Sequence, residues 1–187
     1  MGSFREQLAL ALQHKAFLFE LGRKHPPYND LSVEATYALF KEEFLAQCPI
    51  LDKLGRSVKV EVTNFRKLLN LKLKNGEKKD AWKVVDELET GKFDLSQYQM
   101  EEDRIRTLFW IPEVLSEPDA VYKNGHCTVK ADEVFICVFD KALSKVNLVF
   151  TATFGKKPFT RIEIVTSYLT DAKGALGCIT GEPLYHK

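Results

Sequence analysis

The residues best suited to chemistry lie near the end of the chain, in the run Arg161-Ile-Glu-Ile-Val-Thr-Ser-Tyr168. Alternating apolar residues are typical of a β-strand, in which successive side chains point to opposite faces. Arg161, Glu163 and Ser167 are therefore expected to form one polar line. Because a guanidinium can hold two oxygens of an anion at once, this line is suited to binding phosphate. The alternative is an exposed strand face with a cross-strand ion pair.

Three further polar residues lie next to the expected strands. His126 follows Gly125 in an expected turn, and imidazole is the side chain that titrates nearest physiological pH. Lys130 and Lys141 flank the central strand run and can project toward a phosphate. The alternatives remain open: His126 is an exposed loop residue without a role, and the two lysines are charges that suppress pairing at a sheet edge.

Hydroxyl and aromatic groups can extend such a surface. We expect Thr151, on a neighbouring strand, and Tyr168 to contribute to substrate binding, although Thr151 is equally typical of strands in general. A tryptophan can stack on a nucleobase, but in a chain of 187 residues it is more often a core residue. We therefore expect Trp82 and Trp110 in the core.

The overall charge excludes one class of protein. A formal net charge of +1 gives no global basic field of the kind that marks a constitutive nucleic-acid binder. Locally, residues 56–83 hold nine Lys or Arg against three acids, whereas residues 84–119 hold three against ten. The basic stretch can face a polyanion, or both stretches are solvated faces that partly pair with each other.

Cysteines and apolar runs indicate the compartment. The four cysteines show no CxxC spacing, which disfavours a zinc knuckle, and a chain of this length does not need disulfides. We expect free thiols, a reduced cytoplasmic setting and no bound metal. No signal peptide or eighteen-residue apolar run is visible, so we expect no membrane association. Phosphate-loop, dinucleotide, zincin and hydrolase-elbow motifs are absent as well.

The elements that must position these residues divide into helices first and strands later. Apolar spacing predicts helices over 4–21, 31–48, 65–69 and 81–91, a strand over 58–62, and a helix over 104–115 that is interrupted near Pro112. Four β-rich runs follow, at 120–123, 129–139, 146–154 and 161–169. We predict an α+β fold in which N-terminal helices pack on a C-terminal antiparallel β-meander of about four strands. The expected division is a helical extension (1–55) and an α+β domain (56–187), or one compact domain.

Several short blocks carry a family resemblance. They are Asn64-Phe-Arg-Lys-Leu-Leu69, the segment from Arg104 through Trp110-Ile-Pro-Glu-Val-Leu115, Pro118-Asp119, Val134-Phe-Ile136, Asn147-Leu-Val-Phe-Thr151 and Ile164-Val-Thr-Ser-Tyr168. This order resembles phage- and prophage-associated nuclease domains of the barnase, EndoU, colicin and RelE-like (BECR) group. The resemblance is a pattern of loosely spaced blocks over roughly residues 58–170.

The resemblance implies a toxin-like, metal-independent endoribonuclease without a cofactor. In that reaction a base removes the proton of a ribose 2′-hydroxyl, which attacks the adjacent phosphorus and leaves a cyclic phosphate. Such chemistry needs a base, an acid and cations near the phosphorane oxygens. The residues expected to be catalytic are His126 (base or acid), Glu163 (base or orienter), Arg161 (phosphate clamp) and Ser167 (hydrogen-bond donor). Those expected to bind substrate are Lys130, Lys141, Thr151 and Tyr168.

RNA, including tRNA, is the expected partner, together with a protein that neutralises the toxin. A non-enzymatic interaction or accessory domain on the same α+β platform is the alternative. A different transferase or hydrolase on a similar platform is a third reading, because one fold can carry many chemistries.

Overall fold

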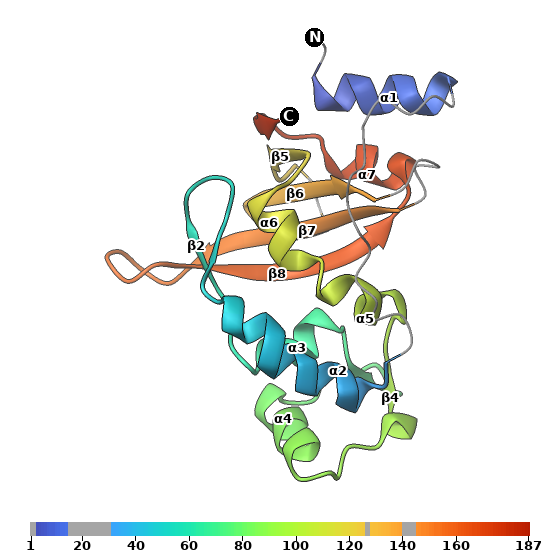
Figure 1. Ribbon diagram of the computed structural model, residues 1–187, viewed down its shortest axis with the longest axis vertical. Helices are drawn as coiled ribbons and strands as arrows, with labels where there is room; N and C mark the ends of the chain where they lie inside the picture. The colour runs from blue at the N-terminus through green and yellow to red at the C-terminus, as the bar shows by residue number, and fades with distance from the viewer. Residues whose placement is uncertain (1–2, 15–30, 126–127, 140–144) are drawn as a thin grey trace.

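A seven-stranded sheet forms the centre of the computed structural model, which describes residues 3–14, 31–125, 128–139 and 145–187 (Figure 1). Its strands are β1 (Ile50–Leu51), β2 (Ser57–Lys59), β5 (Ala120–Lys123), β6 (Glu133–Val138), β7 (Val146–Phe154), β8 (Arg161–Thr170) and β9 (Pro183–His186). Their order across the sheet is β1-β2-β8-β7-β6-β5-β9. A separate pair joins β3 (Lys72–Leu73) and β4 (Tyr98–Gln99).

The mixed α+β class is confirmed, whereas the predicted four-stranded meander is incomplete. Strands β5 to β8 are consecutive antiparallel neighbours, at the predicted places. The sheet continues past this meander at both edges, because β9 pairs with β5 and β2 pairs with β8. The β2–β8 pairing is parallel, and β1 then pairs with β2. Of these added strands, β2 overlaps the predicted strand over 58–62, whereas β1 and β9, with two and four residues, are too short to show an alternating pattern.

Seven α-helices surround the sheet in the described residues. They are α1 (Phe4–His14), α2 (Val33–Leu39), α3 (Asn64–Leu68), α4 (Ala81–Glu89), α5 (Asp103–Leu108), α6 (Ile111–Ser116) and α7 (Ala172–Cys178). Ser32 caps α2, because its Oγ accepts a hydrogen bond from Ala35 N at 3.1 Å. Beyond α2 the coil continues as a π-helix (Phe40–Phe44) and a 3₁₀ turn (Leu45–Gln47). A second 3₁₀ turn, Leu95–Gln97, lies directly before β4.

Each face of the sheet has its own apolar core. The larger core lies among α2 to α6 and the sheet, and includes Phe40, Phe65, Ile111, Phe135, Val149 and Ile164. The smaller core lies among α1, α7 and the sheet, and includes Leu8, Tyr122, Phe150 and Ala175. Residues on both sides of position 55 contribute to the larger core, among them Ile50 and Val58.

The predicted interruption of the helix over 104–115 lies earlier than Pro112. Helix α5 ends at Leu108, and α6 begins at Ile111. Pro112 is therefore in the first turn of α6, where a backbone N–H would have no helical partner and its loss costs little. The proline begins the second helix instead of ending the first.

The structure also tests what was expected of the tryptophans, the cysteines and membrane-spanning helices. Trp110 is buried as expected, but Trp82 on α4 is 65% exposed, so its expected place in the core is wrong. Cys48, Cys137 and Cys178 are free thiols. No helix among the described residues is long and apolar enough to cross a membrane.

Candidate functional site

The polar line expected on strand β8 does not form, because the strand contains a β-bulge. Thr166 lies opposite Phe150 and Ile164 lies opposite Thr151, so Val165 is an extra residue without a partner on β7. An extra residue reverses the alternation of the side chains that follow it. Before the bulge Ile162 and Ile164 face the larger core, so Arg161 and Glu163 point away from it. After the bulge, Leu169 packs against the larger core and Tyr168 against the smaller one.

Ser167 is therefore buried on the side of the larger core, away from Arg161 and Glu163. Its side chain is 2% exposed, and its Oγ donates a hydrogen bond to Asn147 Oδ1 at 3.1 Å. Thr151 is also buried, and its Oγ1 donates to Glu133 Oε2 at 3.0 Å. Both hydroxyls are thus occupied inside the fold. The expectation that Arg161, Glu163 and Ser167 share one face is wrong for Ser167.

The same end of β8 is closed by an arginine from α5. Arg104 is 7% exposed, and its Nη1 donates to Thr166 Oγ1 at 3.1 Å and to the carbonyl oxygen of Ser167. Its Nε donates to Glu101 Oε2 at 2.8 Å. Tyr168 is half-buried and hydrogen-bonds through its hydroxyl to Cys178 Sγ at 3.3 Å. Burial raises the pKa of Tyr168, and the contact with Cys178 raises it further.

The opposite end of β8 carries charged side chains, of which Arg161 is about half exposed and Glu163 is 20% exposed. Arg161 Nε forms an ion pair with Glu163 Oε1. Lys59 lies directly across from Glu163 in the parallel pairing with β2, and its Nζ contacts Glu61 Oε1 at 2.7 Å. Hydrogen bonding and charge from Lys59 lower the pKa of Glu61, and the charge of Arg161 adds to this effect. Cations and carboxylates thus alternate along the open end.

Lys67 on α3 is coupled electrostatically to Glu163 of this group, although no role was predicted for it. Burial lowers the pKa of Lys67 below its ordinary value of 10.5, while Glu163 raises it and Arg66 lowers it further. Helix α3 is placed by Phe65 and Leu68, which are buried in the larger core, and it contacts β8. Arg66 Nε is buried and has no hydrogen-bond partner among the described residues. A lysine whose pKa is lowered by burial and is influenced by the charge of a carboxylate is a candidate for a functional site.

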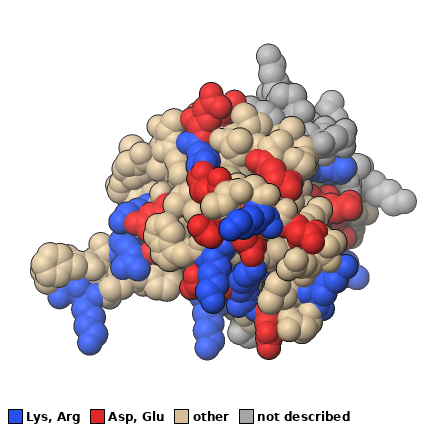
Figure 2. Space-filling model, turned by 90° about the horizontal axis from the view of Figure 1, so that it is seen from below, with Lys and Arg blue, Asp and Glu red and all other residues tan. Residues whose placement is uncertain are grey.

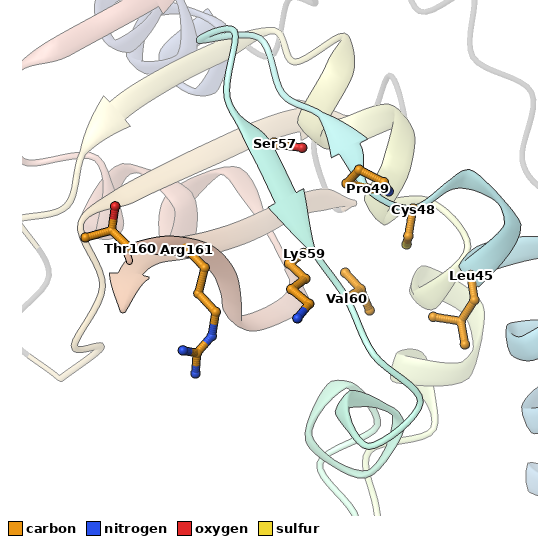
Figure 3. A pocket seen from close by; sticks show the side chains of 8 residues that line it. All are labelled: Leu45, Cys48, Pro49, Ser57, Lys59, Val60, Thr160 and Arg161. Carbon is orange, nitrogen blue, oxygen red and sulfur yellow. The ribbon is translucent and has the colours of Figure 1, made fainter. Parts of the chain in front are cut away.

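A groove opens beside these charges, between the start of β8 and the segment that carries β1 and β2 (Figure 3). Its volume is about 550 Å³. Lys59 and Arg161 line it, with their charged ends projecting in the same direction in Figure 3. The remaining lining residues are Leu45, Cys48, Pro49, Ser57, Val60 and Thr160. An apolar wall with two cations at one side suits a ligand that has both a flat apolar part and a negative charge.

The other expected site residues are not brought to this groove. His126 and Lys141 lie outside the described residues, so their predicted roles stay predictions. Lys130 is exposed in the loop before β6 and does not line the groove. Across the part of the chain that the structure describes, no group of three His, Cys, Asp or Glu side chains could hold a metal ion.

The structure thus replaces the expected line with a different set of groups, Lys67, Glu163, Arg161 and Lys59. A carboxylate can accept a proton, a partly desolvated ammonium can give one, and a guanidinium can hold phosphate oxygens. In the sequence Lys67 lies next to Arg66 in the Asn64-Phe-Arg-Lys block, but nothing in that block marks its burial. The prediction that the basic stretch (56–83) and the acidic stretch (84–119) partly pair with each other is supported by the ion pair between Lys79 and Glu87. Figure 2 shows basic and acidic side chains mixed on one face of the molecule.

Comparison of the chain with protein-family models, with curated proteins and with solved structures gives no match.

Proposed function

We propose that this chain is a metal-independent endoribonuclease that cleaves RNA by attack of a 2′-hydroxyl and leaves a cyclic phosphate. The observation that carries the proposal is the charge group at the open end of β8. It combines a carboxylate, Glu163, with a lysine whose pKa is lowered by burial, Lys67, and an exposed guanidinium, Arg161. The BECR resemblance of the sequence agrees with this chemistry, because it implies the same reaction.

In the proposed reaction Glu163 accepts the proton of the 2′-hydroxyl as its oxygen attacks phosphorus. The bond from phosphorus to the 5′-oxygen breaks, and Lys67 gives that oxygen a proton, so a 5′-hydroxyl leaves. Arg161 turns from Glu163 to the non-bridging oxygens, whose negative charge grows during the attack. Each proton-transfer group of this kind contributes about 10²–10⁴ in rate. His126 remains a second predicted acid or base.

The direct test is incubation of the purified chain with total RNA or tRNA in excess EDTA. We expect RNA fragments whose ends carry a 2′,3′-cyclic phosphate, detected by mass spectrometry. Lys67→Ala should lower the cleavage rate about 10²–10⁴-fold. Lys83→Ala is the matched control, because Lys83 is an exposed lysine on α4. Intact RNA after incubation with the folded chain would exclude the proposal.

A non-enzymatic interaction domain is the second candidate. It is favoured by the ion pair between Arg161 and Glu163, since each neutralises the other without a substrate. In this case Lys67→Ala and His126→Ala would equal the parent in growth toxicity, and a pull-down with the parent chain would retain a protein partner. Cleavage with cyclic-phosphate ends excludes this candidate.

A further inference from the structure

The hairpin that joins β7 and β8 projects beyond the rest of the sheet (Figure 1). On one side, β6 pairs with β7 no further than Thr151. On the other side, β2 pairs with β8 no earlier than Ile162. Among the described residues, neither β6 nor β2 pairs with residues 154–160. We name residues 154–161 the arm.

The tip of the arm has a defined conformation. Gly155 has φ +91°, a backbone conformation that side chains with a Cβ rarely adopt. A Cβ at this position would come within 2.3 Å of the carbonyl oxygen of Phe159. Phe159 N in turn donates a hydrogen bond to Lys156 O at 2.8 Å. The turn therefore fixes the backbone from which the Phe159 side chain projects.

The arm carries an aromatic ring and positive charge without any acidic residue. Phe159 is 84% exposed, the highest value among the exposed large apolar side chains in the described residues, and Phe154 is 39% exposed. Lys156 and Lys157 are exposed, and neither forms an ion pair with a described residue. On the face seen in Figure 2, the projecting arm shows basic and uncharged atoms but no acidic ones. Exposed rings beside cations are the usual surface for single-stranded nucleic acid.

The arm leads directly into the groove of the candidate site. Thr160 and Arg161, at the base of the arm, line that groove together with Lys59 (Figure 3). Phe159 and Glu163 are four residues apart, a separation of at most about 14 Å along an extended chain. One strand of nucleic acid can thus contact the ring, the groove and the charged group in succession.

We propose that the arm binds single-stranded RNA on the flank of the cleavage site, with a base stacked on Phe159 and phosphates held by Lys156 and Lys157. This inference takes RNA as the ligand from the proposed function. A single strand is favoured over a duplex because a protein ring can stack only on a base that is free of its pair. A purely acidic protein would use the lysines but would gain little from the ring.

Binding without cleavage tests the arm. The probe is a fluorescein-labelled, fully 2′-O-methylated oligouridine 12-mer in EDTA, which cannot react because its 2′-oxygens are blocked, and the readout is fluorescence anisotropy. Phe159→Ala should weaken binding about 5- to 150-fold, the effect of one lost base stack. Phe159→Leu keeps an apolar side chain and should lose most of the same affinity. Trp82→Ala, which removes an aromatic side chain on α4 that is 65% exposed, should bind as the parent does.

The lysines are tested through salt dependence. In Lys156→Ala/Lys157→Ala the slope of log affinity against log salt should fall by about 1.4, since each phosphate contact on a single strand contributes about 0.7. Heparin, which has charge but no bases, should bind the parent and Phe159→Ala equally. Equal binding of the RNA probe by the parent and Phe159→Ala overturns the proposal. So does an unchanged salt slope in the lysine variant.

The outcomes separate this inference from the proposed function. If the parent cleaves ordinary RNA while Phe159→Ala binds the blocked probe normally, the arm proposal fails and the nuclease stands. If Phe159→Ala loses probe affinity while the parent leaves ordinary RNA intact, the arm binds RNA and the nuclease proposal fails.

Discussion

At one end of strand β8 the polar side chains are hydrogen-bonded within the fold, whereas at the other end charged side chains lie in or near an open groove. Ser167 and Thr166 belong to the closed end, where Asn147 and Arg104 satisfy them. Arg161 and Glu163 belong to the open end, on the N-terminal side of the bulge at Val165. One extra residue separates the two roles, because it turns the following side chains toward the other face. Polar residues on the same strand can thus serve stability in one half and chemistry in the other.

This difference predicts that substitutions at the two ends fail in different ways. Those at the open end should lower activity with little change in the free energy of unfolding, because the ion pair between Arg161 and Glu163 lies at the surface and contributes little to it. Those at the closed end should lower the free energy of unfolding, because they leave buried polar groups without partners.

The largest effect is expected for Glu163→Gln at the open end. The amide keeps the size of the side chain but cannot act as a base, so the cleavage rate should fall about 10²–10⁴-fold. Urea unfolding should give a midpoint close to that of the parent. Glu182→Gln is the matched control. Glu182 is an exposed carboxylate in the segment before β9, and it forms an ion pair with Lys123 on β5. A Glu163→Gln variant with full activity would remove Glu163 from the proposed reaction.

A smaller effect, now on folding, is expected for Arg104→Met at the closed end. The substitution keeps an apolar stem but leaves the carbonyl oxygen of Ser167 and the hydroxyl of Thr166 without their donor. A hydrogen bond to a charged group contributes about 1.5–3 kcal/mol, and the free energy of unfolding should fall by about that amount. Arg106→Met, on the same helix but about half exposed, is the control. If Arg104→Met unfolded at the same urea concentration as the parent, the closed end would not be held by Arg104.

Ser167 tests whether its hydroxyl serves the fold, as its burial indicates, or the phosphate, as the sequence suggested. Ser167→Ala leaves the buried Asn147 amide without its donor, and Asn147 Nδ2 already lacks a partner among the described residues. We expect a loss of about 1–2 kcal/mol in the free energy of unfolding. Cleavage per folded molecule should stay at the level of the parent.

The double variant Ser167→Ala/Asn147→Leu sharpens this result. Because both partners of a buried hydrogen bond are then replaced by apolar groups, much of the stability lost in Ser167→Ala should return. Thermal unfolding of both variants measures this recovery. A large fall in cleavage rate for Ser167→Ala with unchanged unfolding would instead return Ser167 to the active groups.

The central strands could be predicted from sequence because their apolar residues form long, β-branched runs, as in β6 and β7. The bulge at Val165 could not, because it depends on which residue of β7 lies opposite, and the strand pattern alone does not contain that register. The parallel pairing of β2 with β8 joins residues about a hundred positions apart and rests on two residue pairs. Local patterns carry no information on such a contact.

The same limit explains what was missed at the candidate site. Arg161 and Glu163 were correctly predicted to share a face. Both precede the bulge, in a part of β8 where the side chains alternate regularly. The importance of Lys67 was not visible, because a lysine in a basic segment is normally solvated. Its lowered pKa results from burial at the contact of α3 with β8, which is a tertiary feature.

The smallest expected effect is a shift in pH dependence when Arg66 is changed. If Lys67 gives a proton to the leaving oxygen, cleavage falls as pH rises through the pKa of Lys67, which lies below 10.5. The positive charge of Arg66 contributes to lowering that pKa. In Arg66→Gln the pKa of Lys67 should therefore rise, and the alkaline limb of the kcat/KM profile should move to higher pH.

The acid limb should stay in place in Arg66→Gln, because it reports the base and not Lys67. Arg106→Gln is the control, since Arg106 pairs with Asp103 on α5 and is not among the groups that shift the pKa of Lys67. Removal of any surface cation lowers general affinity for RNA, but such a loss changes kcat/KM by the same factor at every pH. A displaced alkaline limb therefore distinguishes a proton donor at Lys67 from a lysine that only attracts RNA, and an unmoved limb in Arg66→Gln would exclude Lys67 as that donor.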